Sequence, residues 1–310
     1  MKPREIAAAI SACPATALVG LAAILFTGWY WAGNDAARWV LDARAFHGEP
    51  WRLFTSAFLH ADIFHLAFNL YWLWVFGSRV EAIWGSTRTA ALYAVLAAGS
   101  NEMEYAVLDG GIGLSGVGYG LFGLVWMLEK HDPRFRGAID RRTTEVFVGW
   151  FFICIVLTAT KYLPVANFAH AAGWALGALV GAAVTAASQG KRVLYWLGLV
   201  SCLGLVTFAS TAGRRFVNFS PRVGQDWAYI GTQALEDGDY PRAVEFLESA
   251  VAANGKRPGW WRNLGIAYEQ LDRYAAAADA FDRSYQLDPS ATDMRDAAAD
   301  CRARAGRAQE

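Results

Sequence analysis

Long uncharged stretches alternate with short charged segments along the chain as far as residue 213. A helix of about 20 apolar residues crosses the hydrocarbon core of a bilayer, and about 17 suffice when flanking aromatic or basic side chains reach the interface. We therefore expect seven membrane-spanning helices, two of which need their flanking aromatic residues to reach this length. The seven stretches are Ile6–Asn34, Ile63–Ser78, Thr89–Asn101, Gly110–Leu128, Val146–Thr160, Tyr162–Gly190 and Val193–Gly213.

Beyond residue 220 the pattern becomes charged and repeats every 34 residues. The recurring pairs are Trp227 and Trp261, Gly231 and Gly265, Tyr240 and Tyr274, Ala243 and Ala277, with Leu247 and Phe281 at the same offset. This period resembles that of tetratricopeptide repeats, which implies one helix–turn–helix unit at 224–257, another at 258–291 and a capping helix at 292–306. Two repeats are fewer than the usual minimum of about three. We therefore expect a partner surface, the membrane or self-association to complete their core.

Composition supports a membrane protein with an all-α fold. Hydrophobic residues make up 55% of the chain and charged residues only 18%, against about 25% in an ordinary globular domain. The first stretch closes with aromatic residues, Trp29 to Trp31, rather than with a cleavage site, so we expect a retained helix and not a signal peptide. The predicted domains are 1–215, which holds the spans, and 224–306, which holds the repeats.

Several classes of site are not expected. The four cysteines, Cys13, Cys154, Cys202 and Cys301, share no metal-binding or redox spacing. The sequence has no basic patch suited to nucleic acid. We therefore expect no metal, no cofactor and no nucleic-acid partner.

Basic side chains predict which ends of the spans face the cytoplasm. They gather before span one, between spans two and three, after span four and between spans six and seven, whereas the connection between spans three and four is acidic. The basic residues are Lys2, Arg4, Arg79, Arg88, Lys130, Arg134, Arg136, Arg141, Arg142, Lys191 and Arg192, and the acidic ones are Glu102, Glu104 and Asp109. We expect a cytoplasmic N-terminus, with spans four and six beginning at the outer face.

A serine and a histidine lie near the outer ends of two different spans. Ser115 follows Gly113 and Leu114 at the start of span four, and His170 lies early in span six. A serine hydroxyl becomes a good nucleophile when a neighbouring histidine accepts its proton. The shared depth therefore predicts a Ser115–His170 pair. Alternatively, Ser115 bonds to its own helix, and His170 is a proton relay or a polar packing group.

Other residues suit the same chemistry. His65 and Asn69 are four residues apart, so both can point from one helix face at a single oxygen, with the Ser115 amide as a third donor. The alternative for this pair is an interhelical hydrogen bond. Tyr119 lies one turn beyond Ser115, where its ring can stack on His170.

Small residues on both helices allow the close approach that such a pair needs. Gly173, Gly177 and Gly181 follow His170 in span six, and span four contains Gly116, Gly120 and Gly123. The spacing is also common in helices that merely pack.

The chain resembles the rhomboid intramembrane serine proteases over roughly residues 15–190. The matching motifs are Trp51-Arg52 in the first outer loop, His60, the His65–Asn69 pair, Glu81 after span two, Gly113-Leu114-Ser115-Gly116 with Tyr119, and Ala166 to Gly173 around His170. Phe168 departs from the family, which often has a smaller residue there. The resemblance implies a six-plus-one bundle, with the seventh span added to a core of six.

The resemblance also implies a role for each residue. Ser115 would be the nucleophile and His170 the general base and then acid, while His65, Asn69 and the Ser115 amide would form the oxyanion hole. The supporting residues would be Tyr119, Gly113, Gly116, Gly173 and Gly177. The family uses a two-residue dyad, so no aspartate is expected.

The sequence thus predicts a serine endopeptidase of a bacterial cytoplasmic membrane. Its substrates would be single-span membrane proteins cut near the outer face, and its repeats would bind a protein or peptide. One alternative is a non-catalytic adaptor that binds client proteins through its groove and repeats. A separate alternative for the repeats is that they bind nothing and only solubilise the chain. A proton-coupled carrier using His170 is a third possibility, but it requires further acids inside the spans, and the uncharged stretches contain none.

Overall fold

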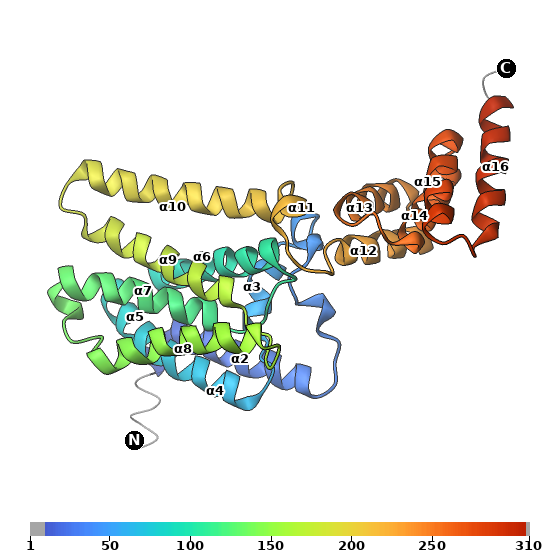
Figure 1. Cartoon of the computed structure of the whole chain (residues 1–310). Coiled ribbons are helices and arrows are strands. Elements are labelled where there is room, and N and C mark those ends of the chain that lie inside the picture. The colour runs from blue at the N-terminus through green and yellow to red at the C-terminus, as the bar shows by residue number, and fades with distance from the viewer. Residues whose placement is uncertain (1–9, 308–310) are drawn as a thin grey trace. The chain divides into compact units, whose positions relative to one another are not determined.

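The structure is a computed structural model that describes residues 10–307, and every regular element in that part is helical. The chain divides into two compact units, Met1–Val217 and Asn218–Glu310 (Figure 1). The predicted all-α fold class is therefore confirmed. Lys2, Arg4 and the beginning of the first predicted span lie outside the described residues.

Each of the seven predicted spans corresponds to a helix or a pair of helices in the first unit. The helices are α2 (Pro14–Trp31), α4 (Ile63–Trp72) continued through a π turn (Leu73–Gly77) into α5 (Ser78–Trp84), α6 (Ser86–Val107), α7 (Ser115–His131), α8 (Arg141–Ala159), α9 (Asn167–Thr185) and α10 (Gln189–Ser210). Helices α2, α8 and α10 expose many of their large apolar side chains, whereas α7 is mostly buried and packs against α6 and α9.

Shorter elements join these helices. The segment between α2 and α4 holds most of them, and the last one ends the unit. They are η1 (Ala36–Arg38), η2 (Ala43–Phe46), α3 (Arg52–Thr55), η3 (Ser56–Phe58), η5 (Pro133–Phe135) and α11 (Arg214–Val217).

Four of the described helices, α2, α8, α9 and α10, are long and apolar enough to cross a membrane, so the chain is a multi-pass membrane protein. The helices of the other three predicted spans do not meet these requirements of length and apolar composition, each for a separate reason. The α-helical part of α4 ends after 10 residues, α7 has 17 residues, and α6 carries charged side chains. Helices that pack against other helices need less apolar surface than helices that face lipid. The seven-span topology stays a prediction.

The structure corrects the expectation that the spans hold no buried acid. Helix α6 continues to Val107, so Glu102 and Glu104 lie in a helix and not in a loop, with only 7% and 2% of their surfaces exposed. Glu102 accepts a hydrogen bond from the Thr207 hydroxyl on α10, and Glu104 accepts one from the backbone N–H of Ala169 on α9. A buried carboxylate is tolerated when donors satisfy it, and the pattern of charges along the chain does not show those donors.

Glu81 is a third buried acid, and it holds the beginning of α2. Its carboxylate accepts hydrogen bonds from the backbone N–H groups of Ala15 and Thr16 at 2.8 Å and from the Thr16 hydroxyl at 2.7 Å. The first N–H groups of a helix lack acceptors within that helix. Glu81 supplies them from α5, and so joins the first two predicted spans.

Glycines bring the backbones of α7 and α9 into direct contact. A Cβ atom at Gly173 would collide with the Gly116 carbonyl oxygen, and one at Gly177 would collide with that of Gly120. The earlier glycine of α9 meets the earlier glycine of α7, and the later one meets the later one. The two helices therefore run parallel, and their N-terminal turns lie at the same end. The backbone contact therefore sets the separation of the two helices that carry Ser115 and His170.

The second unit contains the repeats in the predicted arrangement. Helices α12 (Gln225–Glu236) and α13 (Tyr240–Ala253) form the first pair, α14 (Pro258–Gln270) and α15 (Tyr274–Leu287) form the second, and α16 (Thr292–Arg307) packs on α15. Two helix–turn–helix units followed by a capping helix are thus confirmed.

The 34-residue period arises from a repeated contact within each helix pair. A Cβ at Gly231 would lie 2.7 Å from Cγ of Leu247, and one at Gly265 would lie 2.6 Å from the Phe281 ring. A large side chain of the second helix therefore fills the place beside a glycine of the first helix in both repeats. Leu247 and Phe281 are buried in the core of the unit.

We predict that Gly177→Ala lowers the free energy of unfolding by about 1–3 kcal/mol, because the added methyl group forces α9 away from the Gly120 carbonyl. Denaturation followed by tryptophan fluorescence in detergent micelles measures this change. Gly149→Ala in α8 is the control, since a Cβ there meets nothing within 4 Å. Equal effects of the two substitutions would contradict the backbone contact.

Candidate active site

The structure brings Ser115 and His170 together. Ser115 is the first residue of α7, and His170 lies in the first turn of α9. The distance between Ser115 Oγ and His170 Nε2 is 2.8 Å, which is a hydrogen bond. His170 is buried, with 3% of its surface exposed, whereas Ser115 is half-buried. The hydroxyl thus has a base beside it, and the serine is only partly buried.

Tyr119 orients the imidazole ring of His170. The two rings stack with their centroids 4.6 Å apart and an angle of 23° between their planes. The Tyr119 hydroxyl donates to the Phe147 carbonyl oxygen on α8 at 3.0 Å, so the phenol ring is held at its far end. Nδ1 of His170 has no hydrogen-bond partner among the described residues. Tyr119 therefore holds the imidazole by its face, whereas the carboxylate of a catalytic triad holds it by a hydrogen bond at Nδ1.

His65 and Asn69 lie on α4 next to the segment that leads into Ser115. A Cβ at Gly113 would lie 2.7 Å from His65 Nε2 and 3.5 Å from Asn69 Nδ2. Gly113 also has a φ of +111°, which side chains other than hydrogen rarely allow. The positive φ and the lack of space for a Cβ atom both explain why this position is a glycine. A side chain here would fill the space beside His65 and Asn69.

These groups are available as hydrogen-bond donors. Asn69 Nδ2 is buried and has no partner among the described residues. His65 Nδ1 accepts from the Ala61 N–H at 3.4 Å, so a neutral ring carries its proton on Nε2, the atom close to Gly113. The N–H of Ser115 opens α7, where the first N–H groups lack an acceptor within the helix. His65 and Asn69 therefore both lie beside Gly113, two residues before Ser115.

His60 is a buried residue whose role the sequence did not reveal. It is 0% exposed, and its Nε2 accepts from the Leu114 N–H at 3.3 Å, while its Nδ1 lies 3.1 Å from Thr27 Oγ1. Burial, assisted by the nearby His65, lowers the pKa of His60 to about 3, so the ring is neutral and Nε2 can accept. His60 thus holds the residue that precedes Ser115 against α2.

Arg52 fixes the loop between α2 and α4. Its side chain is 1% exposed and donates to the carbonyl oxygens of Ala37 and Val40 at 2.5 and 2.8 Å. It also pairs with Glu49 at 2.6 Å. Asn101 on α6 donates to the Leu53 carbonyl and ties this loop to the bundle. Arg52 is therefore a buried residue with a structural role in this loop.

Comparison with known proteins agrees with this geometry. Residues 47–187, which include Ser115, His170, His65 and Asn69, match the family model described as the rhomboid domain. The chain contains a rhomboid domain. The family recognised from the sequence motifs is thus confirmed, and residues 230–292 match a tetratricopeptide-repeat model, which confirms the second recognition.

Curated relatives support the same assignment. The chain is 34% identical over 135 residues to proteins named rhomboid protease GlpG from Klebsiella pneumoniae subsp. pneumoniae and from a second strain of Klebsiella pneumoniae. The aligned region covers 42% of this chain and 46% of each relative, so the chain spans about half the length of the relatives it matches.

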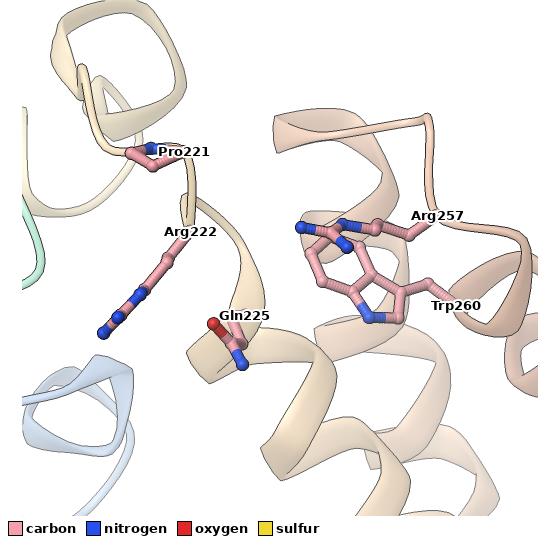
Figure 2. A pocket seen from close by; sticks show the side chains of 5 residues that line it. All are labelled: Pro221, Arg222, Gln225, Arg257 and Trp260. Atoms are coloured by element: carbon pink, nitrogen blue, oxygen red, sulfur yellow. The ribbon is translucent and has the colours of Figure 1, made fainter.

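The repeat unit has a small pocket outside the rhomboid domain. Its volume is about 120 Å³, and it lies where α12 and α14 begin (Figure 2). The side chains that line it are Pro221, Arg222, Gln225, Arg257 and Trp260. Two guanidinium groups, an amide and an indole offer several donors and one aromatic face.

We predict that His60→Leu lowers the free energy of unfolding by about 1–3 kcal/mol, because it leaves the buried Leu114 N–H without its acceptor. Denaturation in detergent micelles measures the change. His131→Leu is the matched control, because that histidine lies at an exposed position and bonds the Met127 carbonyl one turn earlier in its own helix. The control should change stability by no more than about 0.5 kcal/mol. Similar losses in both variants would count against the role of His60.

Proposed function

We propose that this chain is an intramembrane serine endopeptidase that hydrolyses peptide bonds by a Ser115–His170 dyad. The observation that carries the proposal is the 2.8 Å hydrogen bond between Ser115 Oγ and His170 Nε2, made between two helices at their common end. The Asn69 amide, whose Nδ2 has no partner among the described residues, lies beside the segment before Ser115 and adds a donor for developing negative charge. Similarity to proteins named as rhomboid proteases supports the reaction class.

In acylation, Ser115 Oγ attacks the carbonyl carbon of the scissile bond while His170 Nε2 accepts the hydroxyl proton. The carbonyl oxygen becomes negatively charged, and His65, Asn69 and the Ser115 N–H donate to it. His170 then gives its proton to the leaving nitrogen as the C–N bond breaks, which leaves an acyl-enzyme on Ser115.

In deacylation, His170 accepts a proton from water as the water oxygen attacks the acyl carbon. His170 then returns that proton to Ser115 Oγ as the ester bond breaks, which releases the new carboxyl end and restores the hydroxyl. Tyr119 keeps the imidazole plane in place through both steps by stacking. No cofactor takes part in this scheme.

The substrates we propose are single-span membrane proteins of a bacterial cytoplasmic membrane, cut near the outer face. The charge pattern of the loops supports a cytoplasmic N-terminus, and spans four and six then begin at the outer side, where Ser115 and His170 lie. For the repeat unit we propose binding of a protein or peptide that brings a substrate or regulator to the membrane.

There are two alternatives to a protease, a non-catalytic adaptor and a proton carrier. A non-catalytic adaptor would use the groove and the repeats without cleavage. The buried acids Glu81, Glu102 and Glu104 remove the sequence argument against a proton carrier. Each of these carboxylates, however, is bound to donors on a neighbouring helix, which suits a structural role better than a proton path.

We predict that Ser115→Ala and His170→Ala each lower kcat for a transmembrane reporter substrate by at least about 10³-fold. The double variant should lose little more, because the two residues act as a unit. Cleavage by purified protein in proteoliposomes, resolved on gels, measures this loss. Ser201→Ala on the exposed side of α10 and His131→Ala are the controls. Equal cleavage by all variants would end the protease proposal and favour the adaptor.

We further predict that Asn69→Ala lowers kcat by about 10²–10³-fold with little change in KM, because the lost donor acts on the transition state. Steady-state kinetics with the same reporter separate the two constants. Asn34→Ala, an amide that bonds the nearby Trp29 carbonyl at an exposed position, is the control. An unchanged kcat for Asn69→Ala would remove Asn69 from the oxyanion hole while leaving the dyad intact.

A further inference from the structure

Helix α9, which carries His170, begins without a capping side chain of its own. Its N-cap residue is Ala166, whose methyl group offers no hydrogen-bond acceptor. Helices usually begin with a serine, threonine, aspartate or asparagine, whose oxygen accepts the N–H of the second or third helical residue. The first turn of α9 therefore needs an acceptor from elsewhere in the fold.

Glu104 supplies that acceptor from α6. Its Oε2 accepts the Ala169 N–H at 2.9 Å, and its carboxylate also interacts with the Phe168 N–H. Phe168 and Ala169 are the second and third residues of α9, the two whose N–H groups a local cap would bind. The carboxyl group is buried, so the Ala169 N–H finds its acceptor inside the protein and not in water.

The same carboxylate lies beside the segment that leads into Ser115. A Cβ at Gly111 would lie 2.8 Å from Cβ of Ala166 and 3.6 Å from Cγ of Glu104. Glu104 thus occupies the place where the end of α6, the start of α9 and the chain before α7 meet. The residue after the bonded Ala169 is His170 itself.

We propose that Glu104 is a positioning residue for the proposed reaction: it caps α9 from α6 and so holds His170 Nε2 within reach of Ser115 Oγ. This inference rests on the proposed protease function. The 2.8 Å contact between the two reacting atoms depends on where the first turn of α9 lies, and that turn is bonded to Glu104. A displacement of about 1 Å at a reacting centre can cost about 10²-fold in rate.

Helix α6 offers a matched control two residues away. Glu102 is also a buried glutamate, with 7% of its surface exposed against 2% for Glu104, but it bonds the Thr207 hydroxyl on α10 and not α9. Loss of either carboxylate removes a buried interhelical bond. Only the loss at Glu104 frees the turn that holds His170.

The experiment compares the full-length variants Glu104→Leu, Glu104→Gln and Glu102→Leu with the wild type in proteoliposomes. For each, kcat and KM for the transmembrane reporter are measured per folded molecule, along with the rate at which a fluorophosphonate probe labels Ser115. Glu104→Leu should lower kcat and the labelling rate by roughly 10- to 100-fold, with KM within about two-fold of wild type. Glu104→Gln keeps one acceptor and should stay within about three-fold of wild type, and Glu102→Leu should do the same.

Two outcomes would overturn the inference while the protease proposal stands. Wild-type kinetics in Glu104→Leu would show that His170 does not depend on this cap. Equal losses in Glu104→Leu and Glu102→Leu would show a merely structural role for both acids. If the wild type itself fails to cleave or to label, the protease proposal fails first.

If Glu104→Leu does not fold, a double variant decides the question. Glu104→Ala combined with Ala166→Asp moves the cap from α6 to the N-cap position of α9, where aspartate is favoured. Recovery of kcat to within about ten-fold of wild type supports the positioning role. A folded double variant that does not recover kcat overturns it.

Discussion

The backbone contact between α7 and α9 is the constraint on which the first unit depends. Gly116 and Gly120 lie against Gly173 and Gly177, so no side chain separates the two helices. Inside a bilayer, apolar side chains gain little by leaving lipid for protein, and close van der Waals packing becomes the main source of helix association. The packing that joins the helices therefore also sets the distance between Ser115 and His170. Stability and the proposed chemistry have one physical cause.

Polar groups within the bundle mostly have partners on neighbouring helices. Glu81 binds the start of α2, Glu102 binds a hydroxyl on α10, and Glu104 binds the start of α9. An unsatisfied polar group in an apolar interior costs several kcal/mol, so such carboxylates are placed where another helix presents free donors. Asn69 Nδ2 and His170 Nδ1 lack partners among the described residues, and both belong to the candidate active site. Unpaired buried atoms at this position suit a site that a reacting group enters.

The repeat unit is stabilised in a different way, by burial of large side chains against small ones. Leu247 and Phe281 each fill the space beside a glycine, and Met294 and Cys301 of α16 cover the end of the core. Tyr268 donates a 2.5 Å hydrogen bond to Glu248, and burial together with this carboxylate raises the pKa of the tyrosine to about 12. Two repeats thus form a compact unit whose last helix closes one end.

The sequence by itself determined the helices, the repeat period and the residues around Ser115 and His170, because helix length, periodicity and short motifs are local properties of the chain. It did not reveal that α6 holds buried acids. The partners of Glu104 and Glu102 lie 65 and 105 residues away in the chain. Only the tertiary structure decided which carboxylate meets which helix end, that His60 supports Leu114, and that Ser115 and His170 are 2.8 Å apart. The reason is that a buried charge is stable or unstable according to the donors that the crossing helices bring to it, and no stretch of sequence contains that information.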